Sequence, residues 1–293
     1  ATGCVIGLVG EKIVELADKY SDGRIKINYH QDATLGTELE NIQQLKTGEI
    51  DIGHFADNFG SQIATGIDPT VIPFIFKDID DVKAVYDDPV LGAAIKDAAK
   101  STANCYLIGL QERTPRLLTA SKEIKTPADL NGVKVRVPEI PDWVTVWNSL
   151  GALCTVVAWS ETYSALQTGV VDAQENPIDN IFTNKIFEVN KYIMNTEHLL
   201  GLHHWCINAD TYDNMDPADQ EILQRAFDEA NAWGDAELES LADGYWKEVL
   251  ADGSVTVVDV DKDAWSAAAQ VGINTAMAGY SKEAQDYIAN YLG

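Results

Sequence analysis

Residues 132–177 read GVKVRVPEIPDWVTVWNSLGALCTVVAWSETYSALQTGVVDAQENP, and this stretch alternates short apolar runs with amphipathic segments. Its spacing predicts three strands and two intervening helices, over 133–137, 143–150, 154–158, 161–167 and 170–173. Ser160 is a suitable N-cap for the second helix, and Gly151 and Gly169 are placed to end the two helices. Strands that alternate with helices are typical of an α/β fold with mainly parallel sheets.

The same alternation continues on both sides of this stretch. Upstream, the pattern predicts helices over 13–20, 39–48, 80–86, 89–99 and 126–130, and strands over 24–29, 50–55, 105–110 and 119–121. Downstream, a long acidic helix is predicted over 217–250, with Asp216 as its N-cap. With 293 residues, the chain is long enough for one large domain or two lobes.

The chain is strongly acidic. It carries 21 Lys and Arg residues against 46 Asp and Glu residues, a formal net charge of −25. Such a polyanion repels phosphate backbones, so no nucleic-acid partner is expected. The same field slows the approach of an anionic ligand, which makes any arginine placed to meet one informative. The five arginines are Arg24, Arg113, Arg116, Arg136 and Arg225.

Motifs of the common enzyme classes are absent from the sequence, which contains no GxSxG, HExxH, GxxxxGKS/T or GxGxxG. His203 and His204 are adjacent, and neighbours on a strand point to opposite faces, so they are not expected to share a metal ion. The four cysteines form no CxxC pair, which disfavours a zinc or dithiol site and leaves their redox state open. Neither a cofactor nor a metal is expected.

No apolar run approaches the roughly 18–20 residues of a membrane-spanning helix. The first ten residues lack the basic start of a signal peptide, and Glu11 and Lys12 interrupt any apolar stretch. These features predict either a cytosolic protein or the processed form of a secreted one.

The segment 132–138 carries two basic residues within an apolar run. Alternation on a strand places Lys134 and Arg136 on one face and three valines on the other. Taken alone, the pattern fits a solvated edge strand as well as a strand whose basic face meets a ligand.

Two segments, TPADLNGVKVRVP (126–138) and WSETYSALQTGVVDAQENP (159–177), resemble the solute receptors of TRAP transporters, the tripartite ATP-independent periplasmic uptake systems. Further segments match in the family's order and at its spacing: DGRIKI (22–27), LGTELENIQQLKTGEIDIG (35–53) and KIFEVNKYI (185–193). Members usually open with a strand before the first helix, whereas this chain begins almost at the helix. Part of the first lobe's sheet is therefore expected to be missing.

The resemblance implies a two-lobed clamshell of the periplasmic-binding-protein type, with the ligand in the cleft between the lobes. Crossing strands and a long helix would join the two lobes. The first would comprise residues 1–113 and 202–241, and the second residues 114–201 and 242–293. The resemblance also implies a periplasmic, monomeric, non-enzymatic receptor whose partners are a small organic acid and the TRAP membrane permease subunits.

By the same resemblance, Arg136 is similar to the arginine that forms a two-point salt bridge with the ligand carboxylate. Arg116 resembles the second arginine of such sites, and Asn176 the amide that completes the clamp. A planar guanidinium offers paired donors that match both carboxylate oxygens, which Lys134 cannot do.

The resemblance extends to further residues that would line the cleft. Trp159 matches a position where the family often places an aromatic ring, although a Trp before a helix is as often part of the core. The remaining candidates are Glu139, Trp143, His204, Trp205, Phe55 and Asp57. Buried aromatic residues are usually packing residues, which is the alternative for the last four.

Three functional hypotheses remain at this point. The sequence favours a TRAP receptor over a hydrolase or lyase that would use His204 with Glu139 or Glu175, and over a receptor of an ATP-driven importer. Three tryptophans among the cleft candidates favour an aromatic or otherwise flat monocarboxylate as ligand. Sugar acids, either uronates or aldonates, and dicarboxylates are the alternatives.

Overall fold

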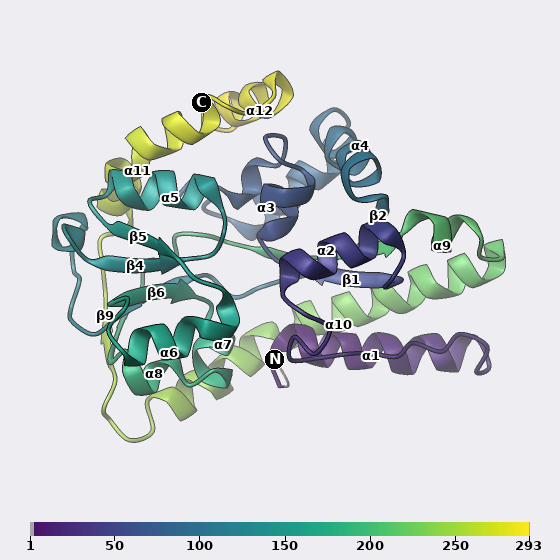
Figure 1. Cartoon of the computed structure of the whole chain (residues 1–293), viewed down its shortest axis with the longest axis horizontal. Helices are drawn as coiled ribbons and strands as arrows, with labels where there is room; N and C mark the ends of the chain where they lie inside the picture. Colours follow the sequence, from purple (N-terminus) through teal and green to yellow (C-terminus); the bar gives the residue numbers. More distant parts are fainter. Residues whose placement is uncertain (1–2, 293) are drawn as a thin grey trace.

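The computed structural model describes residues 3–292, which form an α/β protein with two separate β-sheets (Figure 1). The smaller sheet has the order β1-β8-β2, with β1 (Ile52–Phe55), β8 (Leu202–Asn208) and β2 (Cys105–Glu112). The larger sheet has the order β5-β4-β6-β3-β7-β9, with β5 (Leu153–Val156), β4 (Lys134–Val137), β6 (Ala173–Asn176), β3 (Leu117–Ala120), β7 (Tyr192–Met194) and β9 (Thr256–Val258). The predicted α/β class is confirmed.

The expectation of mainly parallel sheets is wrong. β4 pairs in parallel with β5 and β6, and β7 pairs in parallel with β9. All pairs of the smaller sheet and both pairs of β3 are antiparallel. The reason is that the chain leaves the smaller sheet through β2, enters the larger one through β3, and returns from β7 to β8. Each strand that adjoins a crossing segment therefore pairs with a neighbouring strand that runs in the opposite direction.

Helices cover both sheets, and the main helices predicted from the sequence are present. They are α1 (Val5–Tyr20), α2 (Glu38–Thr47), α3 (Ile79–Asp87), α4 (Leu91–Ala103), α5 (Pro141–Ser149), α6 (Thr162–Gln167), α7 (Ile178–Thr183), α8 (Ile186–Val189), α9 (Ala209–Asp213), α10 (Pro217–Val249), α11 (Lys262–Met277) and α12 (Lys282–Leu292). The short helix expected over 126–130 is a 3₁₀ turn at Pro127–Leu130. Its Asp129 carboxylate accepts hydrogen bonds from the backbone N–H and the hydroxyl of Thr126.

The prediction of a strand over 24–29 is wrong. The segment is extended, and Ile25, Ile27 and Tyr29 pack against the core cluster that includes α1. It forms no ladder with any strand of residues 3–292. Alternating apolar residues produce an extended chain with one covered face, whereas a strand also needs a neighbour whose backbone groups are free to pair.

The strand predicted over 170–173 lies three residues further along the chain, as β6. Val170 and Val171 still donate backbone hydrogen bonds to the carbonyl of Ala165 in α6, so the pairing of β6 starts after them. This shift places Gln174, Glu175 and Asn176 within the sheet, at the carboxyl end of β6.

Of the two predicted N-caps, Ser160 does not hold its position, and Asp216 holds its position without a capping hydrogen bond. α6 follows a 3₁₀ turn at Trp159–Glu161, so that Glu161 occupies the N-cap position in place of Ser160. Asp216 does occupy the N-cap position of α10, but its side chain makes no capping hydrogen bond. Pro217 at the first helical position supplies the start signal there, because its fixed φ suits a helix and its missing N–H needs no partner.

The two lobes are joined by the crossing strands and by α10. Where the strands cross, Arg113 N–H donates to the Gly201 carbonyl at 3.1 Å and Arg116 N–H to the Leu199 carbonyl at 3.0 Å. α10 packs against α1 and β2 of one lobe and against α7 of the other, and it runs along one side of the molecule in Figure 1. The strands of each sheet fall within the predicted lobes, whose exact boundaries stay a prediction.

Candidate functional site

Several of the site residues predicted from the sequence meet where the lobes are joined. Arg116 lies on the crossing segment just before β3, and Arg136 is the third residue of β4. Asn176 ends β6, and the register of the sheet pairs it with Leu117 at the start of β3. The carboxyl ends of β4 and β6 and the start of β3 therefore lie together. In α/β proteins this end of the strands is where ligands bind.

The guanidinium of Arg116 is almost fully engaged by acceptors of the protein. Its Nε lies 2.5 Å from Glu175 Oε2, and its Nη2 lies 3.0 Å from Glu175 Oε1 and 3.1 Å from Asn176 Oδ1. Its Nη1 donates to Asp57 Oδ2 at 3.1 Å. Burial alone would raise the pKa of Glu175, but the Arg116 charge and the His198 hydrogen bond outweigh it and hold that pKa below its usual value.

Asp57 links the crossing segment to the first lobe. It follows β1, and its Oδ2 also accepts from Nη1 of Arg113 at 3.0 Å. Two arginines on the crossing segment thus share one carboxylate from the smaller-sheet lobe, while Glu175 of the other lobe holds Arg116. Asp57, Arg113 and Arg116 are all buried.

Arg136 differs from the other two arginines. It is only 3% exposed, and the single hydrogen bond of its side chain to the described residues runs from Nε to the Val157 carbonyl at 2.9 Å. Its two terminal nitrogens have no acceptor there. Burial is the main cause that lowers the pKa of Arg136 to about 10, and no carboxylate of residues 3–292 forms a direct ion pair with it. The guanidinium carbon lies 5.5 Å from the centre of the Trp159 ring, a distance that suits a cation–π contact.

Polar groups of the first lobe face this region. The capping box of α2, in which Thr37 N–H donates to the Glu40 carboxylate, places Glu38 in the first turn of the helix. The Glu38 carboxylate accepts from the Ala56 N–H and from Asn58 Nδ2, both at 2.7 Å. Burial raises the pKa of Glu38, and its charge acts on Arg136.

Three buried oxygens near Asp57 and Arg113 have no hydrogen-bond partner among residues 3–292. They are Asn58 Oδ1, Ser61 Oγ and Thr114 Oγ1. Asn58 precedes and Ser61 belongs to a π-helical turn at Phe59–Ile63, a rare conformation that often occurs at functional sites. Buried polar atoms are normally paired, so these three oxygens are candidates for contact with a bound polar molecule.

His198 positions Glu175 from the side opposite Arg116. Its Nε2 lies 3.1 Å from Glu175 Oε2, and its Nδ1 lies 2.8 Å from the Thr196 hydroxyl. Its ring packs among Phe74 and Trp147. Burial lowers the pKa of His198.

The structure places the other predicted site residues in three different environments. Trp143 is fully buried, where its Nε1 donates to the Val71 carbonyl at 2.6 Å and its ring lies 4.7 Å from the Arg116 guanidinium carbon. The side chain of Glu139 is exposed, and its carbonyl accepts from Gln62 Nε2 across the two lobes. Trp143 therefore packs behind Arg116, and Glu139 lies at the rim.

Phe55, His204 and Trp205 belong to the interior of the smaller-sheet lobe. Phe55 is fully buried, and its carbonyl accepts from His204 Nδ1 at 3.1 Å. The His204 ring stacks on Phe59, and its Nε2 lies 2.6 Å from the Tyr86 hydroxyl. Trp205 points to the opposite face of β8, against Phe227 of α10. The structure does not bring these three side chains to the arginines.

Arg113, Glu38 and His198 lie around the arginine cluster, although no sequence motif predicts them as site residues. Arg113 had a signal, because it is one of only five arginines in a strongly acidic chain. Glu38 and His198 had none, since their roles depend on which residues the fold places next to them.

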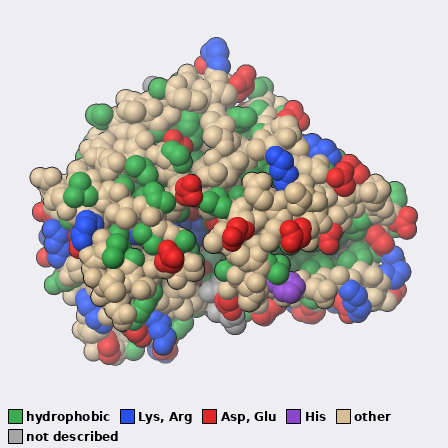
Figure 2. Space-filling model, viewed as in Figure 1, with side chains coloured by type: hydrophobic (Ala, Val, Ile, Leu, Met, Phe, Trp, Pro, Cys, Tyr) green, Lys and Arg blue, Asp and Glu red, His purple; other side chains and the backbone are tan. Residues whose placement is uncertain are grey.

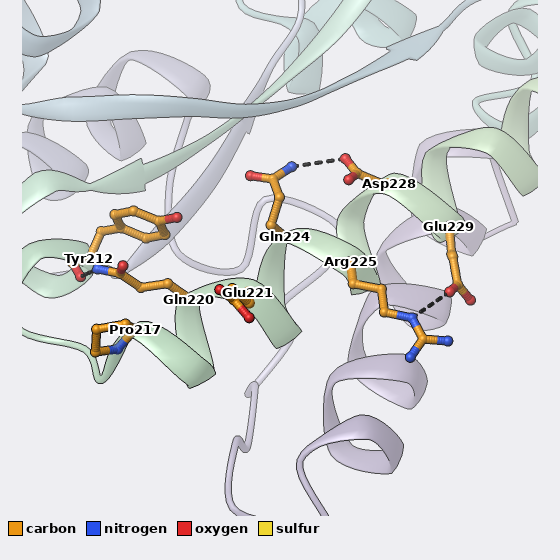
Figure 3. A pocket seen from close by; sticks show the side chains of 8 residues that line it. All are labelled: Tyr212, Pro217, Gln220, Glu221, Gln224, Arg225, Asp228 and Glu229. Carbon is orange, nitrogen blue, oxygen red and sulfur yellow. Dashed lines mark hydrogen bonds and ion pairs between the residues drawn. The ribbon is translucent and has the colours of Figure 1, made fainter.

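The molecular surface adds two hollows outside the arginine cluster. One, of about 460 Å³, lies along α10 and is lined by polar and charged side chains, among them the ion pair Arg225–Glu229 (Figure 3). The other, of about 340 Å³, lies beside α2 and includes Gln62, the residue that contacts Glu139. Acidic side chains are spread over the face shown in Figure 2. Within residues 3–292, no group of three or more His, Cys, Asp or Glu is arranged to hold a metal ion.

No helix in the described part of the chain is long and apolar enough to cross a membrane. The sequence model of the family described as bacterial extracellular solute-binding protein, family 7, matches residues 4–278. A solute-binding protein of Roseobacter denitrificans is 33% identical over 269 residues, which cover 90% of this chain and 80% of that relative.

Two solved structures share the whole architecture. A TRAP periplasmic solute-binding protein from Sulfitobacter sp. NAS-14.1 with bound β-D-galacturonate superimposes with a TM-score of 0.90 at 28% identity, covering 97% of this chain and 94% of that one. One from Roseobacter denitrificans OCh 114 with bound L-galactonate gives a TM-score of 0.89 at 28% identity, covering 99% and 95%.

Proposed function

Because the chain belongs to the family 7 bacterial extracellular solute-binding proteins, which serve TRAP transporters, we propose that its ligand is a hexose-derived sugar acid, a uronate or an aldonate. Family membership makes the protein an extracytoplasmic receptor that binds a small organic acid and works with a membrane permease, and not an enzyme. The alternative of a hydrolase or lyase is therefore set aside.

The observation that carries the proposal is the state of Arg136. It is buried, charged and hydrogen-bonded only through Nε, so both terminal nitrogens remain for a ligand. A carboxylate that accepts two parallel N–H bonds matches these donors in geometry and charge. Trp159, which flanks the guanidinium, would cover the anchored end of the ligand.

Hydroxyl groups explain the rest of the site better than an aromatic ring does. Asn58, Ser61 and Thr114 present unpartnered buried oxygens, and Glu38 presents a carboxylate near Arg136. A polyhydroxy acid supplies donors and acceptors for such groups, whereas a flat apolar ring would leave them unsatisfied. The galacturonate and galactonate of the two similar structures are acids of this kind.

The expectation of an aromatic ligand rested on three tryptophans, and only one of them supports it. Trp143 is held by the Val71 carbonyl, and Trp205 packs on Phe227. Trp159 remains beside Arg136, and a single ring can cover the apolar face of a sugar as well as a flat acid.

Competition at one salt concentration tests the proposal. D-Galacturonate, L-galactonate and an aromatic acid such as benzoate are compared first by thermal shift and then by calorimetry. A ligand at 100 times its Kd stabilises the folded protein by about 2.7 kcal/mol, which a thermal shift detects. We expect one of the sugar acids to bind and benzoate not to displace it. Tight binding of benzoate with no binding of either sugar acid would overturn the proposal.

A further inference from the structure

We infer that the site accepts one carboxylate only, so that it binds uronates or aldonates and rejects the diacid of the same carbon skeleton. This inference rests on the proposed function and narrows it. It depends on which buried charges are already paired within the protein, and in particular on the second arginine of the expected clamp.

Arg116 is not available as a second carboxylate anchor. Of its five N–H groups, four are used by Glu175, Asn176 and Asp57 at 2.5–3.1 Å. Both oxygens of Glu175 point at this guanidinium, so it already has the two-point partner that a ligand carboxylate would supply. His198 holds Glu175 in place from the other side.

The buried charges can be counted through their direct contacts. The buried cations among the described residues, apart from histidines, are the three arginines Arg113, Arg116 and Arg136. Two carboxylates, Asp57 and Glu175, lie in direct ion pairs with the first two of them. Arg136 is the one of these three arginines whose positive charge has no direct ion pair among residues 3–292. A ligand with one carboxylate balances it.

The remaining titratable groups around the site supply no positive charge that could pair with a second carboxylate. Glu38 acts on Arg136, Asp179 on Arg116 and Asp68 on His204, and any charge on these three acids is negative. Burial lowers the pKa of His198, His203 and His204, which favours their neutral forms. No lysine is among the buried described residues.

A second carboxylate would therefore enter the closed site without a counter-ion. Burial of a charge that has no partner costs far more free energy than burial of a hydroxyl group. The oxygens of Asn58, Ser61 and Thr114 can form hydrogen bonds with such a hydroxyl. The diacid thus loses affinity through its charge and not through its size.

Three ligands with the same carbon chain separate charge from size: D-galacturonate, galactarate and the monoamide of galactarate, which has the shape of the diacid and one charge. Calorimetry at pH 7 is expected to show galactarate binding at least about 100-fold more weakly than galacturonate, with the monoamide within about tenfold of it. Equal affinity for galactarate and galacturonate would overturn this inference and leave the proposed sugar-acid function standing. A monoamide as weak as galactarate would also overturn it, because size would then be the cause.

Variants of the paired acids test the same point from the protein side. Glu175→Gln releases the charge of Arg116, so the ratio of the galacturonate and galactarate affinities should fall by about tenfold or more. Asp57→Asn is the second variant, in case Glu175→Gln does not fold, and it should act in the same direction. Glu229→Gln on the surface of α10 is the matched control and should leave the ratio unchanged. An unchanged ratio in both buried variants overturns the inference, whereas binding of none of these three ligands and no binding of L-galactonate overturns the proposed sugar-acid function and this inference with it.

Discussion

Arg116 and Glu175 form a two-point ion pair in which both partners are buried, with side-chain exposures of 4% and 0%. Arg116 belongs to the segment that crosses between the lobes, and Glu175 belongs to β6 of the larger sheet. The pair therefore connects the crossing segment to the larger-sheet lobe. Removal of one partner of such a pair leaves a charge buried without compensation.

Loss of the ion pair between Arg116 and Glu175 should destabilise the fold. Glu175→Ala is expected to lower the free energy of unfolding by about 3–5 kcal/mol, measured by urea denaturation. The exposed pair Arg225–Glu229 is the control, and Glu229→Ala should change the stability little because solvent screens it. Equal effects of the two substitutions would show that burial of the pair is irrelevant.

Arg136 should dominate ligand affinity without supporting the fold. Arg136→Ala is expected to weaken sugar-acid binding by tens to thousands of fold, because truncating one partner of a buried charge pair costs about 2–5 kcal/mol. Arg136→Lys should also bind poorly, since it keeps the charge and loses the paired donors. Calorimetry on both variants checks this, with Arg225→Ala as a matched surface arginine. Unchanged affinity in either variant would contradict the assignment.

The two tryptophans near the arginines should separate into different roles. Trp143→Phe removes the hydrogen bond to the Val71 carbonyl and should cost about 1–3 kcal/mol of stability, with little change in ligand affinity. Trp159→Ala should weaken ligand binding and leave the unfolding midpoint of the ligand-free protein nearly unchanged. Paired calorimetry and urea titrations distinguish the two, and the reverse pattern would refute this division.

Ligand binding should favour a closed arrangement of the lobes. Arg136 belongs to one lobe and Glu38 and Asn58 to the other, so a ligand that contacts both sides binds the closed form more tightly. Small-angle scattering should show a smaller radius of gyration with a saturating sugar acid than without it. The Arg136→Ala protein, given the same ligand concentration, is the control. An unchanged radius in the unmodified protein would mean that the cleft does not close.

Stability should fall as the pH falls below the ordinary pKa of histidine. Burial lowers the pKa of His198, His203 and His204 in the folded protein, so the unfolded chain binds more protons below about pH 6.5. Each such histidine can contribute at most about 1.4 kcal/mol per pH unit in this range. Urea midpoints at pH 7.5, 6.5 and 5.5 measure the slope. His203→Gln should reduce this slope, because it removes one of the groups whose pKa burial lowers.

The sequence by itself determined the local elements and predicted which arginine anchors a ligand carboxylate. Helices such as α1 and α2 follow from periodic apolar residues with polar caps, which act within a few residues of chain. The resemblance of residues 126–138 to the family singles out Arg136, and the scarcity of arginine in this chain and the paired donors of a guanidinium support that choice. Both signals are local, so they do not depend on the rest of the fold.

Tertiary structure decided which predicted residues meet and which charges remain unpaired. The segment 24–29 has the alternation of a strand but no neighbour to pair with, and the sheets are mixed because the chain crosses twice between them. Arg116 and Arg136 look equivalent in the sequence, yet Glu175 and Asp57, which lie 59 residues from Arg116 on either side, engage only the former. Counter-ions that come from distant parts of the chain are set by packing, because the energy of a charge depends on what surrounds it in space.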